Sequence, residues 1–144
     1  MNRPLVSRTL FAGFAIVFTF GFTFAFVAAL LLATSQFTSE AATNADPVRG
    51  KLLFARRCAG CHDLDVDGEG PHLRNVYGRK AGNVPAFQYS DALRSANITW
   101  DDASLEQWLT NPSALVPNTE MDFYVPKAEE RADIIRFLRV SSGK

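Results

Sequence analysis

An uncharged apolar run extends from Leu10 to Ala33 and decides the layout of the whole chain. As a helix, about 24 residues would be about 36 Å long, which is enough to cross a hydrocarbon core of about 30 Å. The run is apolar on all sides, and nothing else in the chain could bury it as a core helix. We therefore expect residues 10–33 to form a transmembrane helix.

A cleaved signal peptide is the alternative to this uncleaved signal anchor. The apolar region of a signal peptide is usually about 7–15 residues long, which is shorter than this run. Ser39-Glu40-Ala41 nevertheless has the small residues that a cleavage site needs. We favour the anchor, and cleavage of the segment stays open.

The basic residues beside the run predict its orientation. Arg3 and Arg8 precede it, and no basic residue follows it closely. Positive charge stays on the cytoplasmic side, so residues 1–9 are expected to be a cytoplasmic stub and everything after the run lies outside. Residues 34–46 are rich in Thr, Ser, Ala and Asn, and are expected to be a flexible linker with a reach of roughly 20 Å.

Residues 47–144 are expected to form one small all-α domain. Apolar residues recur at helical spacing in 48–59, 104–109 and 128–140, and no alternating strand pattern or internal repeat is visible. The helices are few and the loops are long, so the domain has too little regular structure for a complete core of its own. A large buried cofactor would supply the missing core.

The pentapeptide Cys58-Ala59-Gly60-Cys61-His62 predicts which cofactor this is. It contains the only two cysteines of the chain and matches the C-x-x-C-H pattern of c-type haem attachment. Two thiols one helical turn apart can reach both vinyl groups of a haem, and the next imidazole can ligate its iron. A structural zinc site would need about four ligands, and beyond this cluster only His72 and carboxylates are available. A thioredoxin-like dithiol would need a βαβ setting, which the sequence does not show.

Haem iron also needs a sixth ligand or an open site, and the chain offers few candidates. Apart from Met1 the only methionine is Met121, which lies in a polar loop where a methionine has little packing role. A gap-filling core methionine is the alternative. His72 follows His62 by ten residues, so we expect it on the same side of the haem, as a loop or surface histidine.

Nearly the whole domain, from Pro47 to Val140, resembles the class I cytochromes c of the mitochondrial type. The plan of the chain is similar to that of bacterial membrane-anchored cytochromes c, which keep an uncleaved N-terminal helix. Besides the haem pentapeptide, the matching stretches are Gly70-Pro71-His72-Leu73, Tyr77-Gly78-Arg79-Lys80-Ala81-Gly82, Phe87-Gln88-Tyr89-Ser90-Asp91-Ala92, Ile98-Thr99-Trp100, Leu109-Thr110-Asn111-Pro112, Pro117-Asn118-Thr119-Glu120-Met121 and Glu130-Arg131-Ala132-Asp133-Ile134-Ile135.

The resemblance implies a small class I cytochrome c fold wrapped around one covalently bound haem c, which Cys58 and Cys61 hold. It implies that His62 and Met121 are the axial iron ligands, and that the Pro71 carbonyl accepts a hydrogen bond from Nδ1–H of His62.

The resemblance also implies roles for residues further from the iron. Arg79, Tyr89 and Trp100 would surround the haem propionates, although plain core packing would also explain the two aromatic residues. The first and last helices would pack through Gly50, Phe54, Ile134 and Phe137.

The chain departs from the family pattern at several positions. Asn118 replaces a glycine before the distal methionine, which is tolerable because asparagine accepts a positive φ better than most residues. Trp108 replaces the usual tyrosine near the methionine sulfur, so we expect a hydroxyl contact that tunes the iron to be lost. Glu120, Ser113 and Ala114 stand where mitochondrial proteins carry docking lysines.

The expected function is that of a one-electron carrier and not of an enzyme, because a closed six-coordinate haem leaves no place for a small-molecule substrate. The resemblance implies respiratory or photosynthetic membrane partners, namely a cytochrome bc1-type donor and a cytochrome c oxidase-type acceptor. The haem domain would face the periplasm from a single-pass anchor in a bacterial inner membrane. Fifteen basic and fifteen acidic side chains give no sign of nucleic-acid binding.

Two other functions stay open as alternatives. One is a dedicated haem relay subunit of a larger oxidoreductase. The other is a haem enzyme or gas sensor, which would need an open or displaceable distal position.

The charges of the domain predict weak steering toward its partners. From Asp46 onward thirteen basic residues face fourteen acidic ones, a net charge near −1 before the haem propionates. Arg57 and Lys127 would remain near the haem edge, but Glu120 and Asp122 flank the expected distal ligand and oppose their field. We expect a membrane tether, and not charge attraction, to concentrate the domain at its partners.

Overall fold

The computed structural model describes residues 44–144. The expected stub at 1–9, the transmembrane anchor at 10–33 and most of the linker lie outside these described residues, so they stay predictions. Between residues 44 and 144, no helix is both long enough and apolar enough to cross a membrane.

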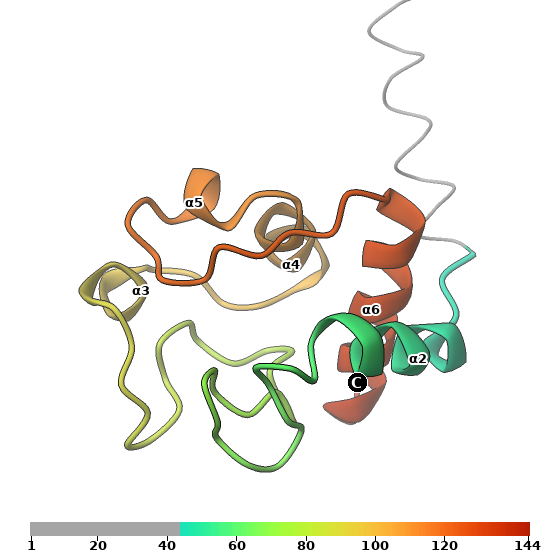
Figure 1. Cartoon of the computed structure of the whole chain (residues 1–144), viewed down its shortest axis with the longest axis horizontal. Coiled ribbons are helices and arrows are strands. Elements are labelled where there is room, and N and C mark those ends of the chain that lie inside the picture. Colours follow the sequence, from blue (N-terminus) through green and yellow to red (C-terminus); the bar gives the residue numbers. More distant parts are fainter. Residues whose placement is uncertain (1–43) are drawn as a thin grey trace, which may run out of the picture. The chain divides into compact units, whose positions relative to one another are not determined.

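The described part of the chain consists of helices joined by long loops (Figure 1). The only β pairing within it is an isolated antiparallel bridge between Lys80 and Thr99. This is the small helical fold that the sequence predicted, and three of the helices match the expected ranges at 48–59, 104–109 and 128–140. The helices are α2 (Pro47–Arg57), α3 (Asp91–Ser95), α4 (Asp102–Thr110), α5 (Pro112–Leu115) and α6 (Ala128–Ser141).

Helix α2 begins and ends at strong local signals. The Asp46 carboxylate caps its N-terminus by accepting hydrogen bonds from the backbone N–H of Val48 (2.7 Å) and Arg49 (3.4 Å). Proline suits the first turn because its missing N–H has no partner there. Arg56 and Arg57 in the last turn complement the negative end of the helix dipole.

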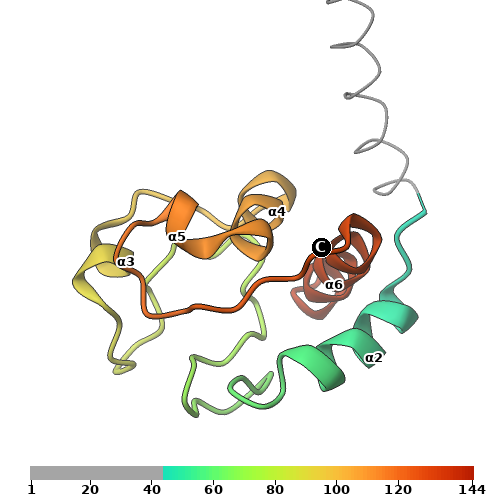
Figure 2. The same ribbon diagram turned by 45° about the horizontal axis from the view of Figure 1, so that its top comes forward.

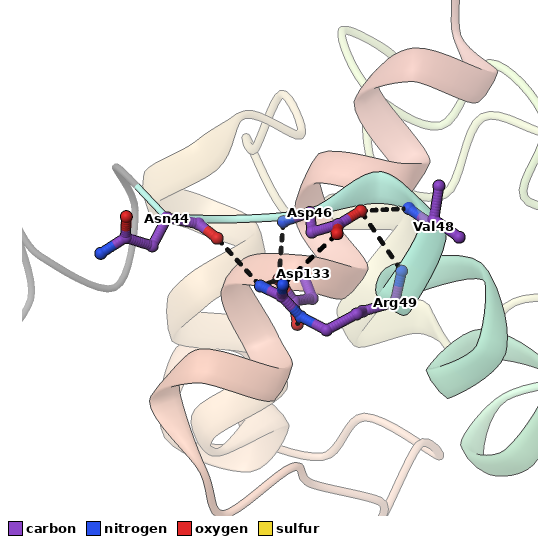
Figure 3. Close-up of polar contacts among 5 residues, drawn as sticks. All are labelled: Asn44, Asp46, Val48, Arg49 and Asp133. Carbon is purple, nitrogen blue, oxygen red and sulfur yellow. Dashed lines mark hydrogen bonds and ion pairs between the residues drawn. The ribbon is translucent and has the colours of Figure 1, made fainter.

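A buried carboxylate joins the start of α2 to α6 (Figure 3). Asp133 of α6 accepts hydrogen bonds from Nε (2.8 Å) and Nη2 (2.9 Å) of Arg49, and from the backbone N–H of Asp46 (2.7 Å). Nη2 of Arg49 also donates to the carbonyl of Asn44 at 2.9 Å. Asn44 and Asp46, which the sequence assigned to the linker, are thus hydrogen-bonded to the domain.

Helices α2 and α6 pack against each other (Figure 2). They approach most closely at Gly50, where there is no room for a side chain. A Cβ atom on Gly50 would lie 2.0 Å from the carbonyl oxygen of Asp133 and 2.8 Å from Cβ of Phe137. Next to this crossing, the rings of Phe54 and Phe137 pack with centroids 5.4 Å apart, and Ile134 is buried. The expected packing of the first and last helices is confirmed.

Helix α4 completes the core from the other side of α6. It starts at a capping box, in which Asp101 accepts from the backbone N–H of Ser104 and the Ser104 hydroxyl accepts from the backbone N–H of Asp101. Its apolar face buries Leu105, Trp108 and Leu109. Together with residues of α6, this face belongs to the core against which loop residues, including Met121, pack.

Candidate functional site

The two cysteines and His62 follow α2 within one further turn of the chain. The backbone N–H groups of Cys61 (3.1 Å) and His62 (2.9 Å) both donate to the carbonyl of Cys58, which keeps the three residues close together. Both thiols are free. Burial raises the pKa of the Cys58 thiol to about 11, so it stays protonated at neutral pH.

The imidazole of His62 is held in one orientation and one tautomer. Its Nδ1 lies 2.8 Å from the carbonyl oxygen of Pro71, and because a carbonyl can only accept, Nδ1 must carry the proton. The lone pair of Nε2 is then available to a metal. A Cβ atom on Gly70 would lie 2.2 Å from Cε1 of the ring, so only glycine fits beneath it. Gly70 and Pro71 therefore form a cradle for His62.

The sulfur of Met121 also has a fixed neighbour. Nε1–H of Trp108 donates to Met121 Sδ at 3.1 Å, and the Trp108 ring is in turn packed against Trp100 with centroids 5.2 Å apart. The tyrosine hydroxyl that the family places near this sulfur is absent, as expected, but the sulfur still has a hydrogen-bond donor. The longer indole ring reaches the sulfur and supplies an N–H in place of the hydroxyl.

Asn118 has the conformation that the sequence argument required of it. Its φ is +67°, in the left-handed region that glycine adopts without penalty and asparagine tolerates. A turn before Met121 is closed by the backbone N–H of Thr119, which donates to the carbonyl of Val116 at 3.2 Å. The loop keeps its shape without the family's glycine.

Arg79 and Trp100, both expected near the propionates, lie side by side. The backbone N–H of Trp100 donates to the carbonyl of Arg79 at 3.0 Å, next to the bridge between Lys80 and Thr99. The Arg79 guanidinium donates to the carbonyls of His72 (2.8 Å) and Arg74 (3.2 Å), and burial lowers its pKa. A partly buried cation of this kind favours a nearby anion.

Tyr89 is partly buried, and this burial raises the pKa of its phenol, while the positive charge of the nearby Arg79 acts in the opposite direction. Its ring packs edge-on against Phe87 with centroids 4.8 Å apart. Arg79 thus lies beside Trp100, which belongs to a different loop, and near Tyr89. Whether they contact propionates stays a prediction.

His72 is paired with an acidic side chain of its own loop. Its Nδ1 pairs with Asp67 Oδ1 at 2.7 Å, and its backbone N–H donates to the same oxygen. These hydrogen bonds, the backbone one first, lower the pKa of Asp67. With this partner, His72 behaves as the loop histidine that its position in the sequence indicated.

The thiol, imidazole and thioether groups of the site suit a covalently bound haem. Two free thiols lie one turn from an imidazole whose tautomer leaves Nε2 available, and a thioether is held by Trp108. The sequence reasoning missed the parts of the site that depend on close contact, namely the fit of Gly70 under the ring and the indole donor. The Gly-Pro pair before His72 was the only local signal for the first of these.

Comparison with known proteins agrees with this arrangement. Residues 47–142 match the family model described as cytochrome c. The chain is 40% identical to cytochrome c2 of Rhodomicrobium vannielii over 112 residues, covering 75% of this chain and 89% of that protein. It is 44% identical to a cytochrome c of Euglena viridis over 97 residues, covering 65% of this chain and 95% of that one.

A solved structure shares the fold. Cytochrome cH from Methylobacterium extorquens superposes with a TM-score of 0.63 at 38% identity, covering 66% of this chain and 98% of that one. The family-model match at residues 47–142 includes the haem-attachment pentapeptide and the helices. The chain is therefore a class I c-type cytochrome of the cytochrome c family, an electron carrier whose cofactor is covalently bound haem c.

Proposed function

We propose that this cytochrome binds its haem through thioethers to Cys58 and Cys61, with His62 and Met121 as the axial ligands, and carries one electron at a time between membrane complexes. The haem supplies the ferrous/ferric couple. The protein supplies the ligands, their orientation and the exclusion of water.

The observation that carries the proposal is the hydrogen bond from Nδ1 of His62 to the Pro71 carbonyl at 2.8 Å. It selects the tautomer in which Nε2 can bind iron, and it raises the basicity of the ring. On the other side, Met121 is partly buried against the core and one sulfur lone pair is occupied by Trp108. A thioether has a second lone pair, which remains for the metal.

Replacing Met121 by alanine tests this ligation. We expect the reduced Met121→Ala protein to bind carbon monoxide, which the wild type should not bind, and its reduction potential to fall because a thioether favours ferrous iron. Phe123→Ala is a matched control, since Phe123 is 40% exposed on the same loop. Unchanged spectra and potential in Met121→Ala would exclude Met121 as a ligand. Carbon monoxide binding by the wild type would instead favour an open-site haem protein.

We further propose that residues 10–33 anchor the domain on the periplasmic face of a bacterial inner membrane. Its donor would be a cytochrome bc1-type complex and its acceptor a cytochrome c oxidase-type complex. The length of the apolar run, the basic residues before it and the family membership support this.

The structure adds a reason to expect weak charge steering. Glu130 lies 2.6 Å from Nη2 of Arg57 and 3.7 Å from Nζ of Lys127, the two basic residues expected near the haem edge. Both charges are therefore partly neutralised within the domain. Glu120 and Asp122 beside Met121 remain exposed. The field of the basic residues on this face should therefore be small beyond a Debye length of about 8–10 Å.

Comparing the full chain with a soluble form that starts after residue 34 tests the anchored mode. We expect the full chain to support oxidase turnover with little dependence on salt, because the tether raises its effective concentration toward the millimolar range. The soluble form should turn over the same oxidase poorly, again with a shallow salt dependence. A steep fall in its rate between low and physiological salt would show that a basic patch steers docking.

A further inference from the structure

The segment that carries Met121 has few internal supports. This distal segment, residues 116–127, runs between α5 and α6 without regular structure, and its central residues around Phe123 and Tyr124 are exposed. Towards its C-terminal end, Val125 is fully buried and its backbone N–H donates to the carbonyl of Leu109 in α4 at 2.7 Å. What holds this end in place decides how firmly Met121 is held.

Arg131 of α6 reaches back to that end of the segment. Its Nη1 donates to the carbonyls of Val125 at 2.8 Å and Pro126 at 2.9 Å. Its Nε and Nη2 lie 2.7 Å and 2.6 Å from the same oxygen, Oε1 of Glu106 in α4. The Arg131 side chain is only 11% exposed, so these charged hydrogen bonds are largely shielded from water.

Glu106 is two residues from Trp108, whose indole donates to Met121. Arg131 thus connects the C-terminal end of the distal segment to the helix that holds the methionine sulfur. We propose that Arg131 is a positioning residue that keeps Met121 on the haem iron by locking the distal segment against α4. The inference rests on the proposed function, because it takes Met121 as the distal ligand.

The chain provides a matched control on the same helix. Arg139 also joins α6 to α4, through Nη1 to Asp102 Oδ2 at 3.2 Å, and its guanidinium lies over the ring of Tyr77 at 5.3 Å. Within residues 44–144, these contacts of the Arg139 guanidinium are with Asp102 and Tyr77 and not with the distal segment. If α6–α4 linkage in general were what mattered, Arg139→Met and Arg131→Met would behave alike.

The test measures how readily an external ligand displaces Met121 from the ferric protein. The haem-loaded full-length chain is mixed with imidazole, and the rate of binding and the absorption band of sulfur-ligated ferric haem are followed. Breaking charge-assisted hydrogen bonds to two carbonyls should open the segment more often, so we expect imidazole to bind Arg131→Met roughly tenfold faster or more. Arg139→Met should bind at the wild-type rate.

Two further measurements separate positioning from loss of overall stability. In Arg131→Met the fast binding should depend only weakly on added urea, because a local opening exposes little surface. Amide hydrogen exchange at Val125 should also be faster in Arg131→Met than in the wild type. Arg131→Lys, which can reach a carbonyl but lacks the planar fork, should be intermediate, and it provides a folded variant if Arg131→Met is too unstable to purify.

Each outcome bears on the proposal. A wild-type imidazole rate and wild-type Val125 exchange in Arg131→Met would overturn it, as would fast binding that rises as steeply with urea as global unfolding does. Equal acceleration in Arg139→Met would also overturn it. If the wild-type protein lacked the absorption band of sulfur-ligated ferric haem, both the ligation by Met121 and the role of Arg131 would be refuted. A normal band with unchanged imidazole binding rates in Arg131→Met would refute only the role of Arg131.

Discussion

Gly50 offers a test in which two physical effects predict opposite signs. It is the fourth residue of α2, inside the helix, where alanine is a better helix former than glycine by about 1 kcal/mol. Judged from the helix alone, Gly50→Ala should stabilise the protein. Judged from the crossing with α6, it should destabilise it.

The distances at the crossing decide between the two. A Cβ atom would lie 2.0 Å from the carbonyl oxygen of Asp133, 2.7 Å from the carbonyl carbon and 2.8 Å from Cβ of Phe137. Carbon atoms normally pack about 3.5–4.0 Å apart, so α2 would have to move away from α6 by about 1 Å or more. The obstacle is backbone, which cannot rotate aside as a flexible side chain could.

That displacement would loosen the contacts that the crossing supports, including the packing of Phe54 on Phe137 and the hydrogen bonds to Asp133. Overpacking of a core usually costs about 1–3 kcal/mol and sometimes more, and this contact is at the severe end. After subtracting about 1 kcal/mol of helix propensity, we expect Gly50→Ala to lower the free energy of unfolding by at least about 2 kcal/mol.

Urea unfolding of the haem-loaded protein, followed by far-UV circular dichroism, measures this. Lys51→Ala is a control at the neighbouring exposed position and should change the stability little. Ala55→Gly, also exposed on α2, should cost about 1 kcal/mol and calibrates the propensity effect in this helix. A Gly50→Ala protein as stable as the wild type, or more stable, would refute the argument from the crossing.

Three further predictions concern single residues. Trp108→Phe removes the donor to Met121 Sδ. Because a net hydrogen bond is worth about 1 kcal/mol, protein-film voltammetry should show a reduction potential lower by up to a few tens of millivolts, and Trp108→Tyr should partly restore it. An unchanged reduction potential would mean that the indole does not tune the site. Ala86 has a φ of +65°, so Ala86→Gly should raise the thermal midpoint, with a stability gain of about 0.5–1 kcal/mol, and a lower midpoint would contradict this. Hydrogen bonds from Ser104, the backbone one first, lower the pKa of Asp101 from its ordinary value of 3.8. The stability that this carboxylate adds is therefore complete above pH 3.8 and is lost as the pH falls through the lower folded-state pKa. Asp101→Asn keeps the cap without a charge, so its free energy of unfolding should lack this loss of stability in an acid titration.

The sequence alone determined the features that depend on neighbouring residues. Helix α2 could be expected from an aspartate cap, a proline and two terminal arginines, all within one stretch. The haem-attachment pentapeptide is likewise local, since its chemistry needs only the spacing of two thiols and an imidazole. The resemblance to the cytochrome c family, which the matched family model confirms, was carried by short motifs of this kind in a fixed order.

The two helices that the sequence did not indicate are the short ones. Helix α3 has 5 residues and α5 has 4, which is too few to show a periodic apolar face. Their caps, Ser90 and Asn111, were the available signals, and Asn111 is followed by a proline.

Tertiary structure decided how the site is supported, because these contacts join residues far apart in the chain. The donor to Met121 comes from Trp108, 13 residues away, and Arg131 reaches Glu106 from a distance of 25 residues. The size of the indole ring is known from the sequence, but the sequence does not show that α4 places this ring next to the sulfur. The crossing at Gly50 has the same character, since glycine is a poor helix former by itself and is required only because the backbone of α6 passes directly over it.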